Sequence, residues 1–485
     1  MNVETRTRPD AAQVAKLTER LTQDYGERAV TNASVREQHS HGEGLADAGM
    51  PDIVVFPHAN DEVASIVRLC NAARIPVIAF GVGTSLEGHV AALYGGVCLD
   101  LSQMNRVLEV NEADLDCRVQ AGVTREQLNA ELKGTGLFFP IDPGANATIG
   151  GMASTRASGT NAVRYGTMRE NVLGVTVVTA DGRIIRTGSR ARKSSAGYDL
   201  TRLFVGAEGT LGVITEVQLR LYGLPEAISA AVCQFDDLKG AVDSVIAAMQ
   251  LGIPVARIEL LDDVQMDACI RYSQLSQYAP KPTLFFEFHG TEAGVREQAE
   301  MIEAIASEHG GSRFQWTTAQ EERTKLWKAR HDAYYAVLAL SPGKQAFATD
   351  ACVPISRLTE CVLETQADVV ATGLVAPIVG HVGDGNFHLV VLFDPTKPEE
   401  RAKAEGLAAR VSLRAIRMGG TCTGEHGVGI HKLDALVAEH GEAVSLMQAV
   451  KRALDPNDIL NPGKTVPRGQ APGAGAPALP LDPGP

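Results

Sequence analysis

The sequence lacks the features of a membrane-spanning, zinc-ribbon or nucleic-acid-binding protein. It contains no apolar run long enough to cross a bilayer, which takes about 18 residues. None of its eight cysteines forms a C-x-x-C pair, so thioredoxin-like redox pairs and the common iron–sulfur spacings are excluded. A formal net charge of −13 argues against nucleic acid as a partner, because nucleic acid requires a basic surface. If the ligand is an anion, the chain needs a local cationic or metal centre.

The N-terminal segment also lacks the apolar stretch of a signal peptide, and its acidic residues are atypical of a transit peptide. Most cysteines stand in apolar runs, which is typical of small buried side chains in a reducing compartment. We therefore expect a cytoplasmic protein, with peripheral contact to an inner membrane left open.

Changes in composition along the chain predict four parts. Residues 1–50 form a helical extension, and residues 51–228 alternate short strands and helices, including a hairpin that turns at Asp181. Longer helices and strands follow in residues 229–465, which predicts a second α+β domain. The tail, residues 466–485, is rich in Pro, Gly and Ala and cannot bury a core, so we expect it to be disordered.

Three glycine-rich turns in the first domain each adjoin an expected strand or helix. The first (81–85) follows the strand 76–80, the second lies within 140–154, and the third (206–212) precedes a strand. Backbone N–H groups exposed in such turns suit a pyrophosphate. Neither a Rossmann nor a Walker loop is present, because Leu86 stands where the third Rossmann glycine is needed. A structural turn would explain any one of the three, but together they predict an anion site.

A second pattern, in the other domain, predicts a metal site. Asp384-Gly385 is a strong two-residue hairpin signal, and a turn there sets His381 directly opposite His388. Opposed side chains on one sheet face have Cβ atoms about 5 Å apart, which suits two imidazoles on one metal ion. Glu425, between glycines, would complete a His₂Glu site with open positions. The alternative is two unconnected polar residues beside a turn.

Two further residues are candidates for the chemistry. His426 could act as a general base near neutral pH, or could be a structural histidine beside Glu425. Arg330 lies within a helical pattern (326–340), where most arginines are solvated. The closing segment 453–464 either returns to the first domain or ends the fold.

Taken in order, these motifs resemble two known domains. The FAD-binding domain of the vanillyl-alcohol oxidase/p-cresol methylhydroxylase (PCMH) superfamily is similar to GVGTS, PIDPGANATIGGMAS, RYGTMRENVLG and GAEGTLGVIT. The C-terminal domain of FAD-linked D-2-hydroxy-acid dehydrogenases is similar to LWKARH, TDACVPIS, GHVGDGNFH, GTCTGEHGVG and LDP…NPGK. The sequences of these motifs are most similar to those of the cytochrome-type D-lactate members of that family.

The resemblance implies an α+β protein, with a two-subdomain PCMH-type FAD-binding domain followed by an α+β substrate domain with an antiparallel sheet. It implies non-covalent FAD, since His89 is offset from the histidine that binds flavin covalently in some relatives. The cofactor-binding residues so implied are Gly81, Gly83, Thr84, Ser85, Pro143, Gly144, Thr148, Gly150, Gly151, Ser158, Gly159, Tyr165, Gly166, Gly209, Val213 and Ile214.

The family also implies that His381, His388 and Glu425 ligate Zn²⁺ or Mn²⁺, that His426 is the base and that Arg330 clamps the substrate carboxylate. The implied reaction oxidises a metal-bound D-2-hydroxy acid, with hydride passing to flavin N5. Because haem and iron–sulfur motifs are absent, the electrons must leave to an external quinone, cytochrome or electron-transfer flavoprotein. A homodimer is left open.

Two positions differ from the 2-hydroxyglutarate members of the family, and this difference limits the range of expected substrates. The 2-hydroxyglutarate enzymes hold the distal carboxylate with a lysine and an asparagine, where this chain has Ala348 and Val390. The expected substrate is therefore D-lactate. The alternatives are a D-2-hydroxyglutarate or glycolate dehydrogenase, a transferase like alkylglycerone-phosphate synthase, and a non-catalytic flavin subunit.

Overall fold

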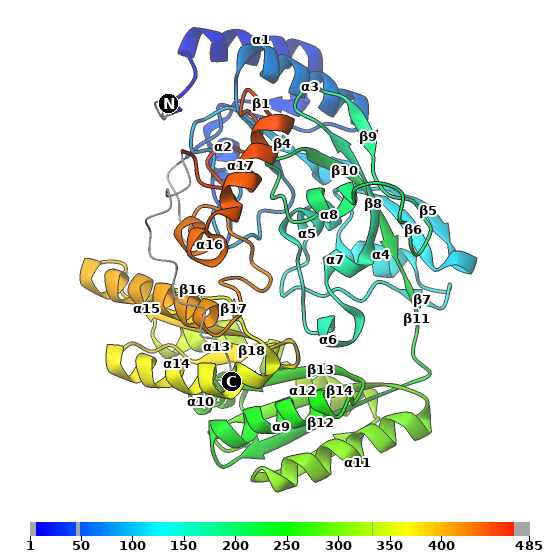
Figure 1. Cartoon of the computed structure of the whole chain (residues 1–485), viewed down its shortest axis with the longest axis vertical. Coiled ribbons are helices and arrows are strands. Elements are labelled where there is room, and N and C mark those ends of the chain that lie inside the picture. Colours follow the sequence, from blue (N-terminus) through cyan, green and yellow to red (C-terminus); the bar gives the residue numbers. More distant parts are fainter. Residues whose placement is uncertain (1–5, 45–48, 332, 470–485) are drawn as a thin grey trace. The chain divides into compact units, whose positions relative to one another are not determined.

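The computed structural model describes residues 6–44, 49–331 and 333–469, which divide into two compact units (Figure 1). The described part of the first unit consists of residues 6–44, 49–158, 166–223 and 425–469, and that of the second consists of residues 159–165, 224–331 and 333–424. The domain boundaries expected at 50, 228 and 465 stay a prediction. Most of the tail 466–485 lies outside the described residues.

The described part of the first unit contains two larger sheets, as expected for a two-subdomain domain, and a two-stranded pairing of β7 (Leu137–Phe138) with β11 (Tyr222–Gly223). A four-stranded sheet has the order β1 (Ala29–Val30), β2 (Ile53–Val55), β4 (Val97–Asp100), β3 (Val77–Phe80). β4 is parallel to both of its neighbours, as βαβ connections require, and α3 (Asn60–Ala73) buries Val63, Ile66 and Val67 in the same core. The helix α1 (Ala11–Tyr25) adds Leu17 and Leu21 to this core.

The other sheet of this unit is antiparallel. Its order is β5 (Val107–Asn111), β6 (Asp116–Gln120), β10 (Val213–Arg220), β8 (Val172–Val178), β9 (Ile184–Arg186). The hairpin predicted at Asp181 is confirmed, because β8 pairs with β9 around it and Gly182 takes the positive φ of 76° that the turn requires. Shorter elements are α2 (Ala33–Gln38), α4 (Arg125–Glu131), α5 (Ile149–Thr155), α7 (Met168–Asn171), α8 (Leu200–Phe204), α16 (Leu433–His440) and α17 (Ala443–Leu454).

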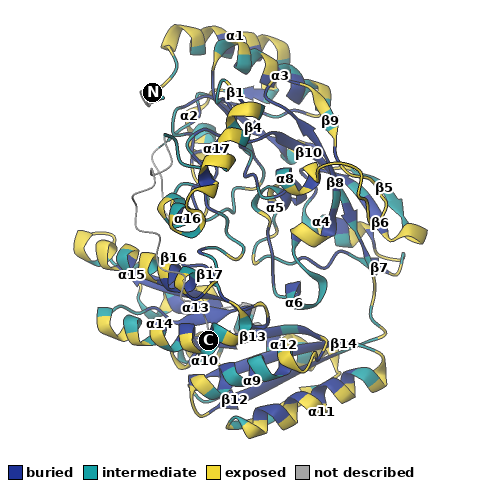
Figure 2. Cartoon of the chain, viewed as in Figure 1, coloured by how far each residue is buried: buried dark blue, intermediate teal, exposed yellow. Residues whose placement is uncertain are grey.

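The second unit is built on one eight-stranded antiparallel sheet. The order is β15 (Gly311–Thr317), β12 (Ala227–Phe235), β14 (Thr283–Gly290), β13 (Val255–Leu261), β18 (Ile378–Gly380), β19 (Asn386–Phe393), β16 (Gln345–Ala348), and β17 (Ala351–Cys352) also pairs with β19. The helices are α6 (Ala162–Tyr165), α9 (Leu238–Gln250), α10 (Asp263–Ser273), α11 (Glu292–Glu308), α12 (Gln320–His331), α13 (Ala333–Leu340), α14 (Leu358–Thr372) and α15 (Pro398–Arg417). In Figure 2 the strands are largely buried, while α9 and α11 keep an exposed face.

The register expected for the hairpin at Asp384-Gly385 is wrong. His388 pairs with Val379 rather than with His381, because a 3₁₀ turn (Val382–Asp384) lengthens the connection. A two-residue type I′ turn needs positive φ at both central residues, and here only Gly385 has it, at 76°. His381 therefore lies in the connection, just beyond the end of β18.

The closing segment returns to the first unit, which was one of the two expected alternatives. The Val77 N–H donates to the Ile459 carbonyl (2.8 Å), and the Asn461 N–H donates to the Val77 carbonyl (2.9 Å). Residues near the C-terminal end thereby extend the edge of the parallel sheet at β3.

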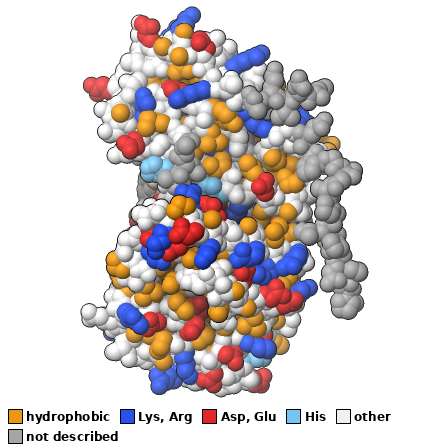
Figure 3. All heavy atoms as spheres, turned by 90° about the vertical axis from the view of Figure 1, so that its left-hand side faces the viewer, with side chains coloured by type: hydrophobic (Ala, Val, Ile, Leu, Met, Phe, Trp, Pro, Cys, Tyr) orange, Lys and Arg blue, Asp and Glu red, His pale blue; other side chains and the backbone are white. Residues whose placement is uncertain are grey.

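The surface carries no large field of one charge sign on the face drawn in Figure 3, where Lys and Arg are interspersed with Asp and Glu. Among the described residues, no helix combines the length and the apolar composition needed to cross a bilayer.

The stability of the second unit should depend on the ionisation of Asp262, which caps α10. Complete burial raises the pKa of this carboxyl from 3.8 to about 7, although the backbone N–H groups of Gln265 and Ile378 donate to it. Between those pH values the folded chain binds a proton that the unfolded chain does not. This contribution to stability is therefore present at pH 4 and is lost as the pH rises through 7.

We expect the stability of Asp262→Asn, whose side chain cannot ionise, to increase relative to that of the wild type as the pH rises. The difference in thermal midpoint between them should move in favour of the variant by roughly 2–4 °C between pH 5 and pH 8, measured by calorimetry. A constant difference for Asp262→Asn would show that this carboxyl is ionised throughout.

Candidate functional site

The three glycine turns converge within the first unit. Gly81 lies against the second turn so closely that a Cβ on it would be 2.2 Å from Thr148 Oγ1. The third turn joins the helix that follows the second, since the Gly206 N–H donates to the Ala153 carbonyl (2.9 Å). Ser85 Oγ, in the first turn, is buried without a hydrogen-bond partner among the described residues. Glycine amides and an unsatisfied hydroxyl in one place suit a phosphate group, so these residues fit the pyrophosphate of FAD.

The other residues implied for FAD are more scattered. Gly144 is exposed, and the side chains of Val213 and Ile214 pack in the two hydrophobic cores of the first unit. Tyr165 belongs to the second unit, where its hydroxyl lies 2.7 Å from His289 Nδ1. One of the remaining positions, Gly159, lies in the second unit. The others lie in the first unit and are Gly83, Thr84, Pro143, Gly150, Gly151, Ser158, Gly166 and Gly209.

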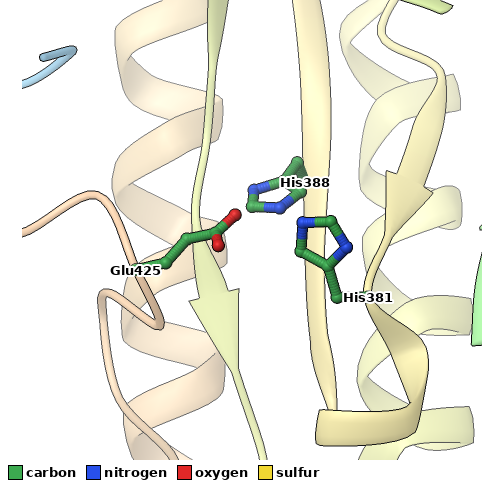
Figure 4. Close-up of side chains that lie close together, drawn as sticks. All are labelled: His381, His388 and Glu425. Atoms are coloured by element: carbon green, nitrogen blue, oxygen red, sulfur yellow. The ribbon is translucent and has the colours of Figure 1, made fainter. Parts of the chain in front are cut away.

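His381, His388 and Glu425 form the metal-type cluster (Figure 4). One ligand atom from each lies within 4.8 Å of the others, and the two imidazoles meet edge to face with ring centroids 5.5 Å apart. His388 comes from β19, His381 from the turn after β18, and Glu425 directly follows Gly424, the last residue of this stretch of the second unit.

The hydrogen bonds of the two histidines leave the nitrogens that a metal needs. His388 Nδ1 lies 2.9 Å from the Thr349 carbonyl and His381 Nδ1 lies 2.7 Å from Glu259 Oε1, and both of these oxygens can only accept. Each Nδ1 therefore carries the proton, and each Nε2 keeps its lone pair. Two such imidazoles and a carboxylate are the donor set of an open Zn²⁺ or Mn²⁺ site, so the residues fit the implied ion.

Glu259 is a site residue that the sequence analysis missed. It lies on β13, completely buried, and its second oxygen accepts from Arg330 Nε at 2.7 Å. Burial alone would raise the pKa of Glu259, but His381 and Arg330 hold it below its ordinary value. The available signal was Arg257 and Glu259, two charged residues with a strand spacing inside an otherwise apolar run.

His426 faces a second carboxylate that the sequence analysis missed. Its Nδ1 lies 3.5 Å from Glu87 Oε1, and Lys432 Nζ (3.0 Å) and His431 Nδ1 (3.3 Å) also contact Glu87. Burial would raise the pKa of Glu87, but Lys432 and the two imidazoles hold it well below its ordinary value. At 3.5 Å the contact between His426 and Glu87 is an ion pair, and a carboxylate so close to Nδ1 favours a proton on that nitrogen, which suits a base acting through Nε2.

The loop that carries Glu425 and His426 is held by Glu208, from the third glycine turn. Glu208 accepts hydrogen bonds from the backbone N–H groups of Val428 (2.7 Å) and Gly429 (2.8 Å). Gly427 has a φ of +83°, and a Cβ on it would lie 2.7 Å from Glu208 Oε1, so only glycine fits.

The wall beside His388 is apolar. Ala348 pairs directly with Val390 across β16 and β19, and Val390 follows His388 by two residues, so all three share one face of the sheet. Val390 packs in a buried cluster that includes Trp327. Lys344, the residue before β16, is paired with Glu400 at 3.2 Å.

Curated relatives match most of the chain. The chain is 51% identical over 438 residues to a protein of Danio rerio named probable D-lactate dehydrogenase, mitochondrial, covering 90% of this chain and 88% of that one. It is 47% identical to the mitochondrial D-lactate dehydrogenase [cytochrome] of Arabidopsis thaliana, covering 93% and 78%. It is 35% identical to glycolate oxidase subunit GlcD of Bacillus subtilis, covering 86% and 89%.

These names contradict the expected cytoplasmic location, because the D-lactate dehydrogenases of animal, plant and yeast are all named mitochondrial. The expectation was wrong because amino-acid composition does not specify the compartment to which a protein is targeted. Targeting signals are recognised by receptors, so a globular composition and reduced cysteines are equally compatible with several compartments.

Solved structures share the fold. The 4-ethylphenol oxidase of Gulosibacter chungangensis superposes with a TM-score of 0.78 at 20% identity, covering 95% of this chain and 99% of that one. Alkyldihydroxyacetonephosphate synthase gives 0.74 at 19%, covering 95% and 87%. At this identity the likeness concerns the fold alone.

Family models match both halves of the chain. The model of an FAD binding domain matches residues 51–188, and that of the FAD linked oxidases, C-terminal domain, matches residues 224–465. With relatives that match nearly its whole length, this chain belongs to the FAD-linked oxidases, in the group that contains the D-lactate dehydrogenases.

Proposed function

We propose that this protein oxidises D-lactate, or a similar small D-2-hydroxy acid, to the 2-oxo acid with FAD as cofactor. The observation that carries the choice of substrate is the apolar pair Ala348 and Val390 beside His388, in a chain 51% identical to a D-lactate dehydrogenase. A methyl group suits such a wall, whereas a second carboxylate would be buried there without a cationic partner.

The proposed reaction assigns a separate role to each residue of the site. Arg330 binds the substrate carboxylate, and His426 takes the proton of the C2 hydroxyl at Nε2, while the nearby Glu87 carboxylate stabilises the positive charge that the imidazole gains. Bound FAD supplies the acceptor for the C2 hydride, and an ion at His381, His388 and Glu425 supplies a Lewis acid that makes the hydroxyl more acidic. The proton and the hydride together account for the two hydrogens removed.

The electrons must then leave the protein. Relatives from plant and yeast carry the word cytochrome in their names, so we propose a cytochrome as the external acceptor. A homodimer and peripheral membrane contact stay predictions.

FAD should be bound without a covalent link. We expect acid precipitation of the yellow protein to release all of its FAD into the supernatant, measured by absorbance and fluorescence. Flavin that stays on the denatured chain would contradict this expectation and direct attention to His89, whose ring lies 3.4 Å from Glu208.

Loss of one metal ligand should abolish turnover without loss of FAD. We expect His388→Ala to lose its bound Zn²⁺ or Mn²⁺ and at least about 100-fold in kcat, because Lewis-acid stabilisation contributes several kcal/mol. Metal content by mass spectrometry and dye-coupled turnover are the measurements. His440→Ala, on a half-exposed helix end, is the control. Undiminished activity in metal-free His388→Ala would remove the ion from the mechanism.

The apolar wall should set the substrate preference. We expect kcat/KM for D-lactate to exceed that for D-2-hydroxyglutarate by at least about 100-fold, which needs only about 2.7 kcal/mol. Glycolate, which lacks the methyl group, should fall below D-lactate by a smaller factor. The double variant Ala348→Lys, Val390→Asn should narrow the gap to 2-hydroxyglutarate. A wild type that prefers 2-hydroxyglutarate would refute the choice of D-lactate but leave the FAD and metal proposals standing.

A further inference from the structure

Two buried carboxylates on neighbouring strands of the second unit have matching surroundings. Glu259 on β13 lies between His381 and Arg330, with both hydrogen bonds at 2.7 Å. Glu287 on β14 lies between His289, at 2.9 Å, and Arg257, at 3.4 Å. Each carboxylate is thus compensated by one arginine and one histidine.

These two groups share one face of the sheet. Arg257 and Glu287 are directly opposed in the pairing of β13 and β14, and Glu259 follows Arg257 by two residues. Burial would raise the pKa of both carboxylates, but the histidine and the arginine beside each hold its pKa below the ordinary value. What separates them is the identity of their partners, because only Glu259 contacts a member of the metal-type cluster.

The two oxygens of Glu259 impose two separate constraints. Oε1 accepts the proton on His381 Nδ1, which fixes the tautomer and turns Nε2 towards the other ligands, as the ring in Figure 4 is oriented. Oε2 accepts from Arg330 Nε, so a substrate carboxylate bound by this guanidinium in a bidentate manner must use its Nη1 and Nη2 edge. One rigid, buried side chain therefore sets both a metal ligand and the carboxylate clamp.

We propose that Glu259 is a positioning residue that couples the metal ligand His381 to the substrate-binding Arg330. This inference rests on the proposed function, because it assigns those two roles to its partners. The competing explanation is that Glu259 only neutralises a partly buried arginine, the role that the ion pair with Arg257 assigns to Glu287.

The structure supplies a matched control for separating these explanations. Glu259→Gln and Glu287→Gln each remove one buried negative charge beside one arginine and one histidine, so both should lower the thermal midpoint. Only Glu259→Gln should weaken binding of Zn²⁺ or Mn²⁺, by about 10- to 100-fold, as measured by titrating the metal into chelator-treated, FAD-loaded protein. The same variant should raise KM for D-lactate, while Glu287→Gln keeps its metal Kd within about 2-fold of the wild type.

Glu259→Asp keeps the test decisive if the Gln variant does not fold. The shorter side chain retains the charge but cannot reach both partners, so we expect weakened metal binding together with a smaller loss of stability than in Glu259→Gln. Equal metal affinity in the wild type, Glu259→Asp and Glu259→Gln would overturn the inference, as would an equal loss in Glu259→Gln and Glu287→Gln. A wild type that binds no metal would instead refute the metal part of the proposed function.

A double-mutant cycle tests the coupling itself. If Glu259 connects its two partners, the factor by which Glu259→Gln raises the metal Kd should differ by at least about 2-fold between the wild-type background and the Arg330→Met background. The direct electrostatic effect of Arg330 on the ion is present in both backgrounds and cancels in the cycle. Effects that multiply would leave Glu259 as a neutralising group without a coupling role.

Discussion

Charge buried in a sheet must be compensated within hydrogen-bonding distance, because a carboxylate that loses its water is otherwise too costly to hold ionised. The second unit meets this constraint at Glu259 by using Arg330 and His381 as partners. The compensation has a by-product, since groups that neutralise a rigid carboxylate are themselves held in place. The geometry proposed for metal and substrate binding thus follows from a requirement of folding.

The first unit meets the same constraint with backbone groups as well as side chains. Glu208 is buried, which would raise its pKa, but His89, the Val428 N–H and Thr465 hold that pKa below its ordinary value. The chain carrying Glu425 and His426 is thereby tied to the third glycine turn, although more than 200 residues separate them in sequence. Loops that bear reactive side chains are often mobile, and this anchor limits that freedom.

Local patterns predicted local structure well, and failed where long-range pairing decides. The hairpin at Asp181 was predictable from its Asp-Gly pair, but the same pair at Asp384 gave a wrong register, because only Gly385 adopts a positive φ. The two histidines still meet, since one imidazole can approach another from several registers. Glu259 and Glu87 escaped notice because their partners lie 71 or more residues away and meet them only once the chain has folded.

The return of the C-terminal segment to β3 has a consequence for how this protein is made. The first unit is discontinuous, and its parallel sheet gains the Val77–Asn461 pairing only after the whole second unit has been synthesised. During translation the second unit can therefore complete its core first, whereas the flavin-binding unit must wait for residues that are synthesised after the second unit. Its long-range contacts make it the slow-folding partner, and the period before closure is when its apolar sheet edge is open to chaperones or to aggregation.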